Sequence, residues 1–145
     1  GLPERSITYY PGDRPYKIGD LTFTHGDVAK KNNWDSVQGG TVAGAAARRI
    51  GSSVVMGHTH LMGCVSINSW NHRWQGYECG CLCRLDLEYI VAIPQWTQGW
   101  AVATIGEHAS NVEFVRSVPC GDIRKLVFRD RVLADLPGLS SKPAG

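Results

Sequence analysis

Two histidine segments constrain the fold of this chain more than any other feature. The first is Thr24-His25-Gly26-Asp27, and the second, Gly57-His58-Thr59-His60, places His58 33 positions after His25. Each segment follows an apolar run that predicts a buried strand, over residues 20–25 and 54–56. Loops at the ends of buried strands are where α/β proteins usually build their sites. The pattern therefore predicts an α/β chain whose site lies on these two loops.

The stretch between the two segments predicts a helix over residues 37–50. It is rich in alanine, and Val42, Ala46 and Ile50 recur at helical spacing. Gly51 can stop this helix, after two arginines that suit the negative end of its dipole. Strand, helix and strand in this order form a βαβ-like unit, for which we expect a right-handed crossover.

The remainder of the chain predicts mostly strands. We expect a strand over residues 61–67, a polar and aromatic loop over 68–78, and antiparallel strands over 100–105, 112–118 and 123–127. Turns are expected at residues 106–107 and 119–121. Residues 1–17 are expected to form a loop or arm. Residues 1–135 should form a single, partial domain, followed by a flexible tail over 136–145.

The spacing of His58 and His60 favours metal binding. A single residue separates them, so an extended loop would point both imidazoles to the same side. Neutral imidazole is the commonest side-chain ligand for transition metals. His25, His58 and His60 are therefore the candidate metal ligands. Asp27 either accepts a hydrogen bond from the second ring nitrogen of a ligand or is a turn carboxylate.

These residues also carry a family resemblance. His25-Gly26-Asp27 and Val55-Met56-Gly57-His58-Thr59-His60 resemble the last two motifs of the calcineurin-like metallophosphoesterases, which hydrolyse phosphate esters at a two-metal centre. The segment Gln95-Trp96-Thr97-Gln98-Gly99-Trp100 resembles one found in phage and bacterial members. The resemblance implies the C-terminal half of a four-layer α/β/β/α sandwich with mixed and antiparallel strands. It further implies that His25 and His58 bind one divalent ion (Mn, Zn, Fe or Ni) and His60 a second.

The earlier motifs of that family are absent from this sequence. There is no Asp-x-His, no Gly-Asp-x-x-Asp and no Gly-Asn-His. The resemblance therefore implies that the chain needs a complementary N-terminal half for hydrolysis of a phosphodiester or phosphomonoester, with nucleotides or nucleic acid as the favoured substrates. A start at Gly1 rather than Met fits a fragment or a processed product.

A non-catalytic role is the alternative to the enzyme hypothesis. A remnant or split-gene product could act as a binding or structural subunit. Half of a layered sheet would leave an open edge and an exposed apolar face. We therefore expect association, either with itself or with a complementary half.

Composition limits the remaining possibilities. The chain has 145 residues, of which 43% are hydrophobic and 19% charged, as in an ordinary soluble domain. A net charge of +2 is too small to argue for nucleic-acid binding by electrostatics alone. No apolar stretch approaches the roughly 20 residues of a membrane span. We expect a cytoplasmic protein.

The five cysteines form an odd set without a regular framework, so we expect free thiols in a reducing compartment. Cys79-Gly80-Cys81-Leu82-Cys83 is unusual, because all three thiols would face one side if the segment is a strand. They are either ligands for a soft metal or small, half-apolar residues of the core.

Several other residues allow two interpretations. The aromatic side chains of residues 68–78 either stack on a base or sugar or pack the loop onto the sheet; they are Trp70, Trp74 and Tyr77. His72 and Arg73 either contact substrate or are exposed loop residues. His108 is expected to be solvated.

Overall fold

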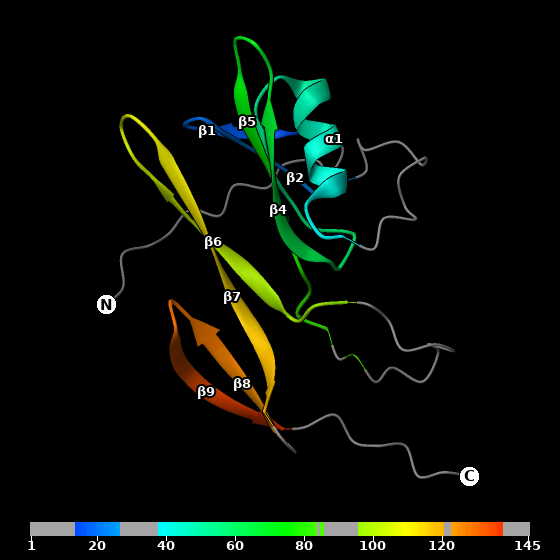
Figure 1. Cartoon of the computed structure of the whole chain (residues 1–145), viewed down its shortest axis with the longest axis vertical. Coiled ribbons are helices and arrows are strands. Elements are labelled where there is room, and N and C mark those ends of the chain that lie inside the picture. The colour runs from blue at the N-terminus through cyan, green and yellow to red at the C-terminus, as the bar shows by residue number, and fades with distance from the viewer. Residues whose placement is uncertain (1–13, 27–37, 84, 86–95, 121–122, 138–145) are drawn as a thin grey trace, which may run out of the picture.

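The computed structural model describes residues 14–26, 38–83, 85, 96–120 and 123–137. In this part of the chain, two β-sheets and one helix, α1, are present (Figure 1). The elements run in the order β1 (Tyr16–Ile18), β2 (Leu21–Thr24), α1 (Thr41–Ile50), β3 (Ser53–Met56), β4 (Met62–Asn68), β5 (Arg73–Cys79), β6 (Gly99–Ile105), β7 (Ser110–Cys120), β8 (Ile123–Phe128) and β9 (Arg131–Pro137).

The first sheet is mixed and has the strand order β1-β2-β3-β5-β4. Strand β3 pairs in parallel with β2 on one side and with β5 on the other, whereas the outer pairs are antiparallel. The βαβ-like unit expected from the sequence is confirmed, because β2, α1 and β3 follow one another and the two strands are parallel. Parallel pairing brings the carboxyl ends of β2 and β3 to one edge.

The helix begins at Thr41, after Gly40 in a left-handed conformation with φ 95°. The part of the predicted helix before residue 38 lies outside the described residues. Gly40 offers no side-chain cap, and the first turn carries no acidic residue. The helix ends as expected at Gly51, whose φ of 73° is left-handed and whose N–H donates to Ala47 O at 2.8 Å.

The central strands of the first sheet are buried on both faces, whereas β1 at its edge is exposed. Alternate residues of β3 point to opposite sides, as the pleat requires. Val54 and Met56 pack against the small residues of α1, together with Ile67 of β4. Val55 lies in a second cluster with Tyr77 of β5, and strands β6 and β7 of the other sheet complete that cluster. The described chain thus forms layers of helix, mixed sheet and antiparallel sheet.

Glycines allow α1 to lie close on the sheet. A Cβ atom on Gly76 of β5 would collide with the backbone of Ala43 and Gly44. A Cβ on Gly44 would in turn collide with Val65 of β4. The glycines that weaken the intrinsic preference for helix are therefore the residues that permit its tight packing.

The prediction of a loop over residues 68–78 is wrong. Strands β4 and β5 form an antiparallel hairpin, closed by a turn in which Ser69 N donates to His72 O at 2.9 Å. Polar residues hide the alternation of β5, in which Trp74 contacts the helix-side cluster and Tyr77 the opposite one. The strand predicted over 61–67 is confirmed as β4.

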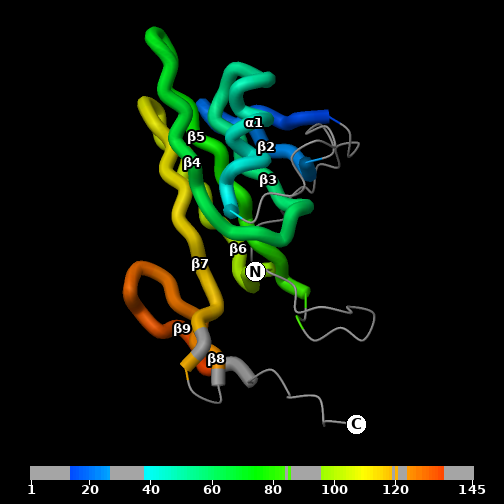
Figure 2. The backbone as a smooth tube through the Cα atoms, turned by 45° about the vertical axis from the view of Figure 1, so that its right-hand side comes forward, coloured from blue at the N-terminus to red at the C-terminus, as the bar shows by residue number. Residues whose placement is uncertain are grey.

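The second sheet is an antiparallel meander, β6-β7-β8-β9. It confirms the three strands predicted after residue 100. The expected turn at 119–121 is wrong in part, because Pro119 and Cys120 pair with β8. Strand β9 was not expected, and it extends to Pro137, inside the predicted tail. Strands β8 and β9 lie at the end of the molecule away from α1 (Figure 2).

The fold class predicted from the sequence is confirmed at its coarser level, since a helix accompanies mixed and antiparallel strands. Among the residues described, no helix has the length and apolar character needed to span a bilayer.

Candidate metal-binding site

The parallel pairing of β2 and β3 brings His25 and His58 together. Thr24 and Met56 are register partners at the ends of these strands, and His25 follows Thr24 directly. His25 Nε2 lies 3.0 Å from His58 Nδ1. The two rings meet edge to face, with centroids 4.8 Å apart and planes at 82°. We call these two residues the histidine pair.

The loop that carries His58 and His60 is sharply turned rather than extended. Thr59 N donates to Gly57 O at 2.9 Å, which closes a three-residue turn around His58. His58 has a φ of 70° and His60 a φ of 60°. Residues other than glycine seldom adopt a positive φ, and such backbone strain concentrates at functional sites. The prediction of an extended loop with both imidazoles on one side is therefore wrong, and the two rings have different neighbours.

A buried carboxylate holds this loop against the helix. Glu78 of β5 is 0% exposed. Its Oε1 accepts hydrogen bonds from Val42 N at 2.8 Å and Ala43 N at 3.1 Å, and its Oε2 accepts one from Thr59 Oγ1 at 2.8 Å. Glu78 thus serves as the N-terminal cap that Gly40 cannot supply. It also fixes Thr59, which lies between the two candidate ligands.

His60 lies with two cysteines instead of with the histidine pair. One ring nitrogen of His60 and the Sγ atoms of Cys81 and Cys83 all lie within 4.8 Å of one another. The ring packs edge to face on Trp96, with centroids 4.3 Å apart and planes at 80°. We call His60, Cys81 and Cys83 the thiol cluster.

The His60 ring is suited to act as a ligand. Its Nδ1 atom is buried and has no hydrogen-bond partner among the described residues. Burial is the main cause that lowers the pKa of His60, and repulsion from His58 and His25 adds to it. The ring is therefore neutral near pH 7, the form that can donate a lone pair to a metal.

The cysteines are free thiols, as expected. The segment from Cys79 to Cys83 is not one continuous strand, because β5 ends at Cys79 and Gly80 turns the chain with a φ of 77°. The condition under which all three thiols would face one side is therefore not met. Cys79 packs instead against the cluster around Tyr77, and burial raises the pKa of its thiol to about 11. Burial, together with the neighbouring Cys83, raises the pKa of Cys81 to about 12. Two of the three thiols therefore lie beside one imidazole, and the third packs in the core.

The other candidates from the sequence are more dispersed. Asp27 lies outside the described residues. Trp74 and Tyr77 pack in the interior, which confirms the structural alternative for both. Trp70 is 99% exposed at the tip of the β4–β5 hairpin, where His72 stacks on Trp74 with centroids 4.9 Å apart. His108 is exposed, as expected.

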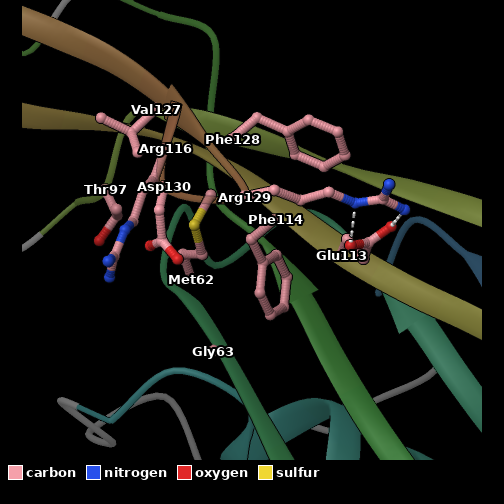
Figure 3. Close-up of a pocket in the computed structure, with 10 residues that line it drawn as sticks. All are labelled: Met62, Gly63, Thr97, Glu113, Phe114, Arg116, Val127, Phe128, Arg129 and Asp130. Atoms are coloured by element: carbon pink, nitrogen blue, oxygen red, sulfur yellow. Dashed lines mark hydrogen bonds and ion pairs between the residues drawn. The ribbon is translucent and has the colours of Figure 1, made fainter. Parts of the chain in front are cut away.

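A hollow of about 620 Å³ lies beside the second sheet, around the turn between β8 and β9 (Figure 3). An ion pair between Glu113 and Arg129 lies along it, near Phe128. Neither histidine nor cysteine lines this hollow. The residues suited to bind metal are therefore gathered elsewhere, at the Gly57–His60 loop.

Sequence reasoning missed Glu78 and the grouping of His60 with Cys81 and Cys83. A signal for Glu78 was available, because a helix with neither a side-chain cap nor an acidic first turn needs an acceptor from elsewhere. The alternation of Trp74, Gly76 and Glu78 would have put that carboxylate on the helix side of a strand. No comparable signal linked His60 to the cysteines.

Comparison with known proteins gives no significant match, either to a family model, to a curated protein or to a solved structure.

Proposed function

We propose that this chain supplies the C-terminal half of a metal-dependent phosphoesterase centre. The observation that carries the proposal is the contact of His25 with His58, at the carboxyl ends of two adjacent parallel strands. The sequence motifs that resemble metallophosphoesterases contain these same two residues. The four-layer sandwich of that family belongs to the proposal, and the three described layers are compatible with it.

The histidine pair fits a shared divalent ion. Two nitrogens bound at a right angle, each about 2.1 Å from an ion, lie about 3.0 Å apart. The separation of His25 Nε2 and His58 Nδ1 is 3.0 Å. Either ring can instead donate a hydrogen bond to the other, so a metal ion would replace one proton between them. His25 is exposed, so solvent and a partner chain can reach this position.

Two divalent ions at such a centre supply an activated hydroxide and neutralise charge on the phosphoryl oxygens of the substrate. In this proposal, His25 and His58 bind one ion and His60 belongs to the second position. The hydrogen bond between Thr59 and Glu78 holds the loop, so that the imidazole rings of His58 and His60 keep their orientation. The substrate is a phosphate ester, with nucleotides or nucleic acid as the first class to test.

The described residues do not supply the carboxylates that such a centre needs. The complementary N-terminal half would contribute them, together with the remaining ligands. We therefore expect no hydrolysis above background from this chain alone. Combination with a polypeptide that carries Asp-x-His, Gly-Asp-x-x-Asp and Gly-Asn-His motifs should generate Mn²⁺-dependent activity.

The test is hydrolysis of bis-p-nitrophenyl phosphate by the chain alone and together with the polypeptide encoded directly upstream. His58→Ala should abolish the activity of the combination, whereas His108→Ala, a change at an exposed histidine, should retain it. Strong hydrolysis by the chain alone would contradict the need for a second half. Hydrolysis that His58→Ala leaves unchanged would contradict the site.

A binding or structural subunit is the second candidate function. Strand β6 lies at one edge of the second sheet, and its Trp100 and Val102 side chains are exposed. An edge strand with exposed apolar side chains favours association with another chain. Light scattering at micromolar concentration tests this candidate. A dimer would favour it, and a clean monomer would count against it.

A further inference from the structure

We propose that the thiol cluster, His60, Cys81 and Cys83, binds a thiophilic divalent metal ion, with Zn²⁺ as the first candidate. Two observations carry this inference independently of any family resemblance. The three ligand atoms converge within 4.8 Å of one another, although His60 is far from the cysteines in sequence. The Nδ1 atom of His60 is buried with no hydrogen-bond partner among the described residues.

The backbone around the thiol cluster is already fixed by hydrogen bonds between three segments. Gly80 N donates to Leu61 O at 2.7 Å, which joins the cysteine segment to the histidine loop. Thr97 N donates to His60 O at 2.9 Å, and Cys81 N donates to Thr97 O at 3.0 Å. The three segments therefore close around the cluster, so a metal ion would find its ligands already assembled.

Side-chain contacts complete this arrangement. The Gln98 side chain donates to Cys83 O at 2.9 Å, which holds the second cysteine. Trp96 packs against the His60 ring, which limits its rotation. Leu82, between the two cysteines, is exposed, whereas Cys81 is buried and Cys83 is half-buried. A single bridge between Cys81 and Gln98 ties this segment to the chain that precedes β6.

The donor set selects the metal. Two thiolates and one imidazole favour Zn²⁺ over Mg²⁺, Ca²⁺ or Mn²⁺, which prefer oxygen ligands. Ligand atoms of a tetrahedral zinc ion lie about 3.4–3.8 Å apart. The ligand atoms of the cluster, which lie within 4.8 Å of one another, must therefore approach by up to about 1.4 Å. Three protein ligands leave a further position for water or a partner's side chain.

The thiol cluster differs from the histidine pair in its ligand atoms, and a negative result at one site would not decide the other. The inference does not rest on the proposed phosphoesterase function, because the thiol cluster has a complete three-ligand set of its own. If both proposals hold, the zinc ion occupies the second metal position, to which His60 belongs. The cysteines then supply ligands that the complementary half need not provide.

Cobalt is the probe of choice, because Co²⁺ substitutes for Zn²⁺ and thiolate ligands give it a sulfur-to-metal charge-transfer absorption. The full chain is titrated with Co²⁺ under reducing conditions, and Zn²⁺ is then added. We expect an absorption that saturates at one equivalent of Co²⁺ and disappears when Zn²⁺ displaces it. The double variant Cys81→Ser/Cys83→Ser should lose this absorption.

Matched variants separate the possible results. The double variant Cys64→Ser/Cys120→Ser removes two exposed thiols and should keep the full absorption. His25→Ala/His58→Ala should also keep it, since neither residue belongs to the cluster. His60→Ala should weaken Co²⁺ binding while some thiolate absorption persists. Circular dichroism of each variant verifies that it is folded.

Absence of charge-transfer absorption in the unaltered chain would overturn the inference. Equal absorption in the Cys81→Ser/Cys83→Ser variant would also overturn it, because other thiols would then be the ligands. Loss of absorption in His25→Ala/His58→Ala alone would contradict the independence of the two sites. A failed cobalt titration would overturn the proposal for the thiol cluster only. Binding of Mn²⁺ by the histidine pair would still have to be tested by its own titration.

Discussion

The histidine pair and the thiol cluster lie on either side of Thr59, yet they are built in different ways. His25 and His58 come from neighbouring parallel strands, and the pair is partly exposed. His60 reaches two cysteines from a segment that follows β5, and Cys81 is only 8% exposed. The pair offers two nitrogens, whereas the cluster offers one nitrogen and two sulfurs.

The difference shows how one short loop can direct two neighbouring histidines into different surroundings, each of which we propose as a metal position. Left-handed backbone at His58 and at His60 directs adjacent ligands to different neighbours. An extended loop would have given them the same environment. The hydrogen bond from Thr59 to Glu78 fixes the loop between the two histidines. The histidine pair and the thiol cluster therefore share one supporting carboxylate but offer different ligand atoms.

Removal of the shared scaffold should have the largest effect. Glu78→Ala leaves two helix N–H groups and the Thr59 hydroxyl without their buried acceptor. We expect a loss of roughly 2–4 kcal/mol in the free energy of unfolding, with weaker metal binding at both positions. Urea denaturation measures the loss. Glu107→Ala, at an exposed turn, is the control and should stay within about 0.5 kcal/mol of the unaltered chain.

A smaller change tests the loop alone. Thr59→Val removes the hydroxyl that donates to Glu78 at 2.8 Å and leaves the side-chain volume almost unchanged. The free energy of unfolding should fall by about 1–2 kcal/mol, since a charged acceptor loses a partner. Thr59→Ser keeps the hydroxyl and should recover most of the loss. Equal denaturation midpoints for the valine and serine variants would argue against this hydrogen bond.

Backbone strain at His58 distinguishes the ligand role from a structural role. Glycine adopts positive φ without the penalty that a Cβ atom incurs. His58→Gly should therefore be more stable than His58→Ala by about 1 kcal/mol, although both variants lose the ligand. Thermal unfolding of the two proteins gives the difference. If alanine is as stable as glycine, His58 does not hold the φ of 70° found here.

The smallest expected effect lies outside both proposed metal positions. Hydrogen bonding from Ser110 lowers the pKa of Asp20 below its ordinary value of 3.8. Because the pKa of Asp20 is lower in the folded state, its ionised carboxylate stabilises the folded protein at pH values above 3.8. This stabilisation is lost as the pH falls through the lower pKa of the folded state. Because Asp20 is exposed, Asp20→Asn should cost about 0.5 kcal/mol or less at pH 7. Denaturation at several pH values should show the gap closing in acid, with metal binding unchanged.

Local sequence pattern was sufficient for the histidine pair and insufficient for the thiol cluster. Apolar runs predicted β2 and β3, the alanine-rich stretch predicted α1, and parallel pairing then follows from the βαβ order. The cluster depends on the turn at Gly80 and on hydrogen bonds between segments distant in sequence. Such tertiary contacts leave no periodic signal, so the sequence could propose a soft-metal site at the cysteines without including His60.

Tertiary contacts also account for the wrong prediction at β5. Arginine, glutamine and glutamate in this strand suggested a solvated loop, yet Glu78 is buried because the helix N-terminus supplies its hydrogen bonds. A buried carboxylate with three donors costs far less than its charge alone would imply. Strand β9 was missed for a different reason, since its exposed Val132 and Leu133 do not alternate clearly with polar residues.

A calorimetric titration with Mn²⁺ tests the separation of the two positions most directly. The proteins compared are the unaltered chain, His25→Ala/His58→Ala and Cys81→Ser/Cys83→Ser. We predict Mn²⁺ binding to the unaltered chain and to the cysteine variant, and its loss from the histidine variant. Mn²⁺ binding that persists in the histidine variant, or disappears only from the cysteine variant, would contradict this account of the site.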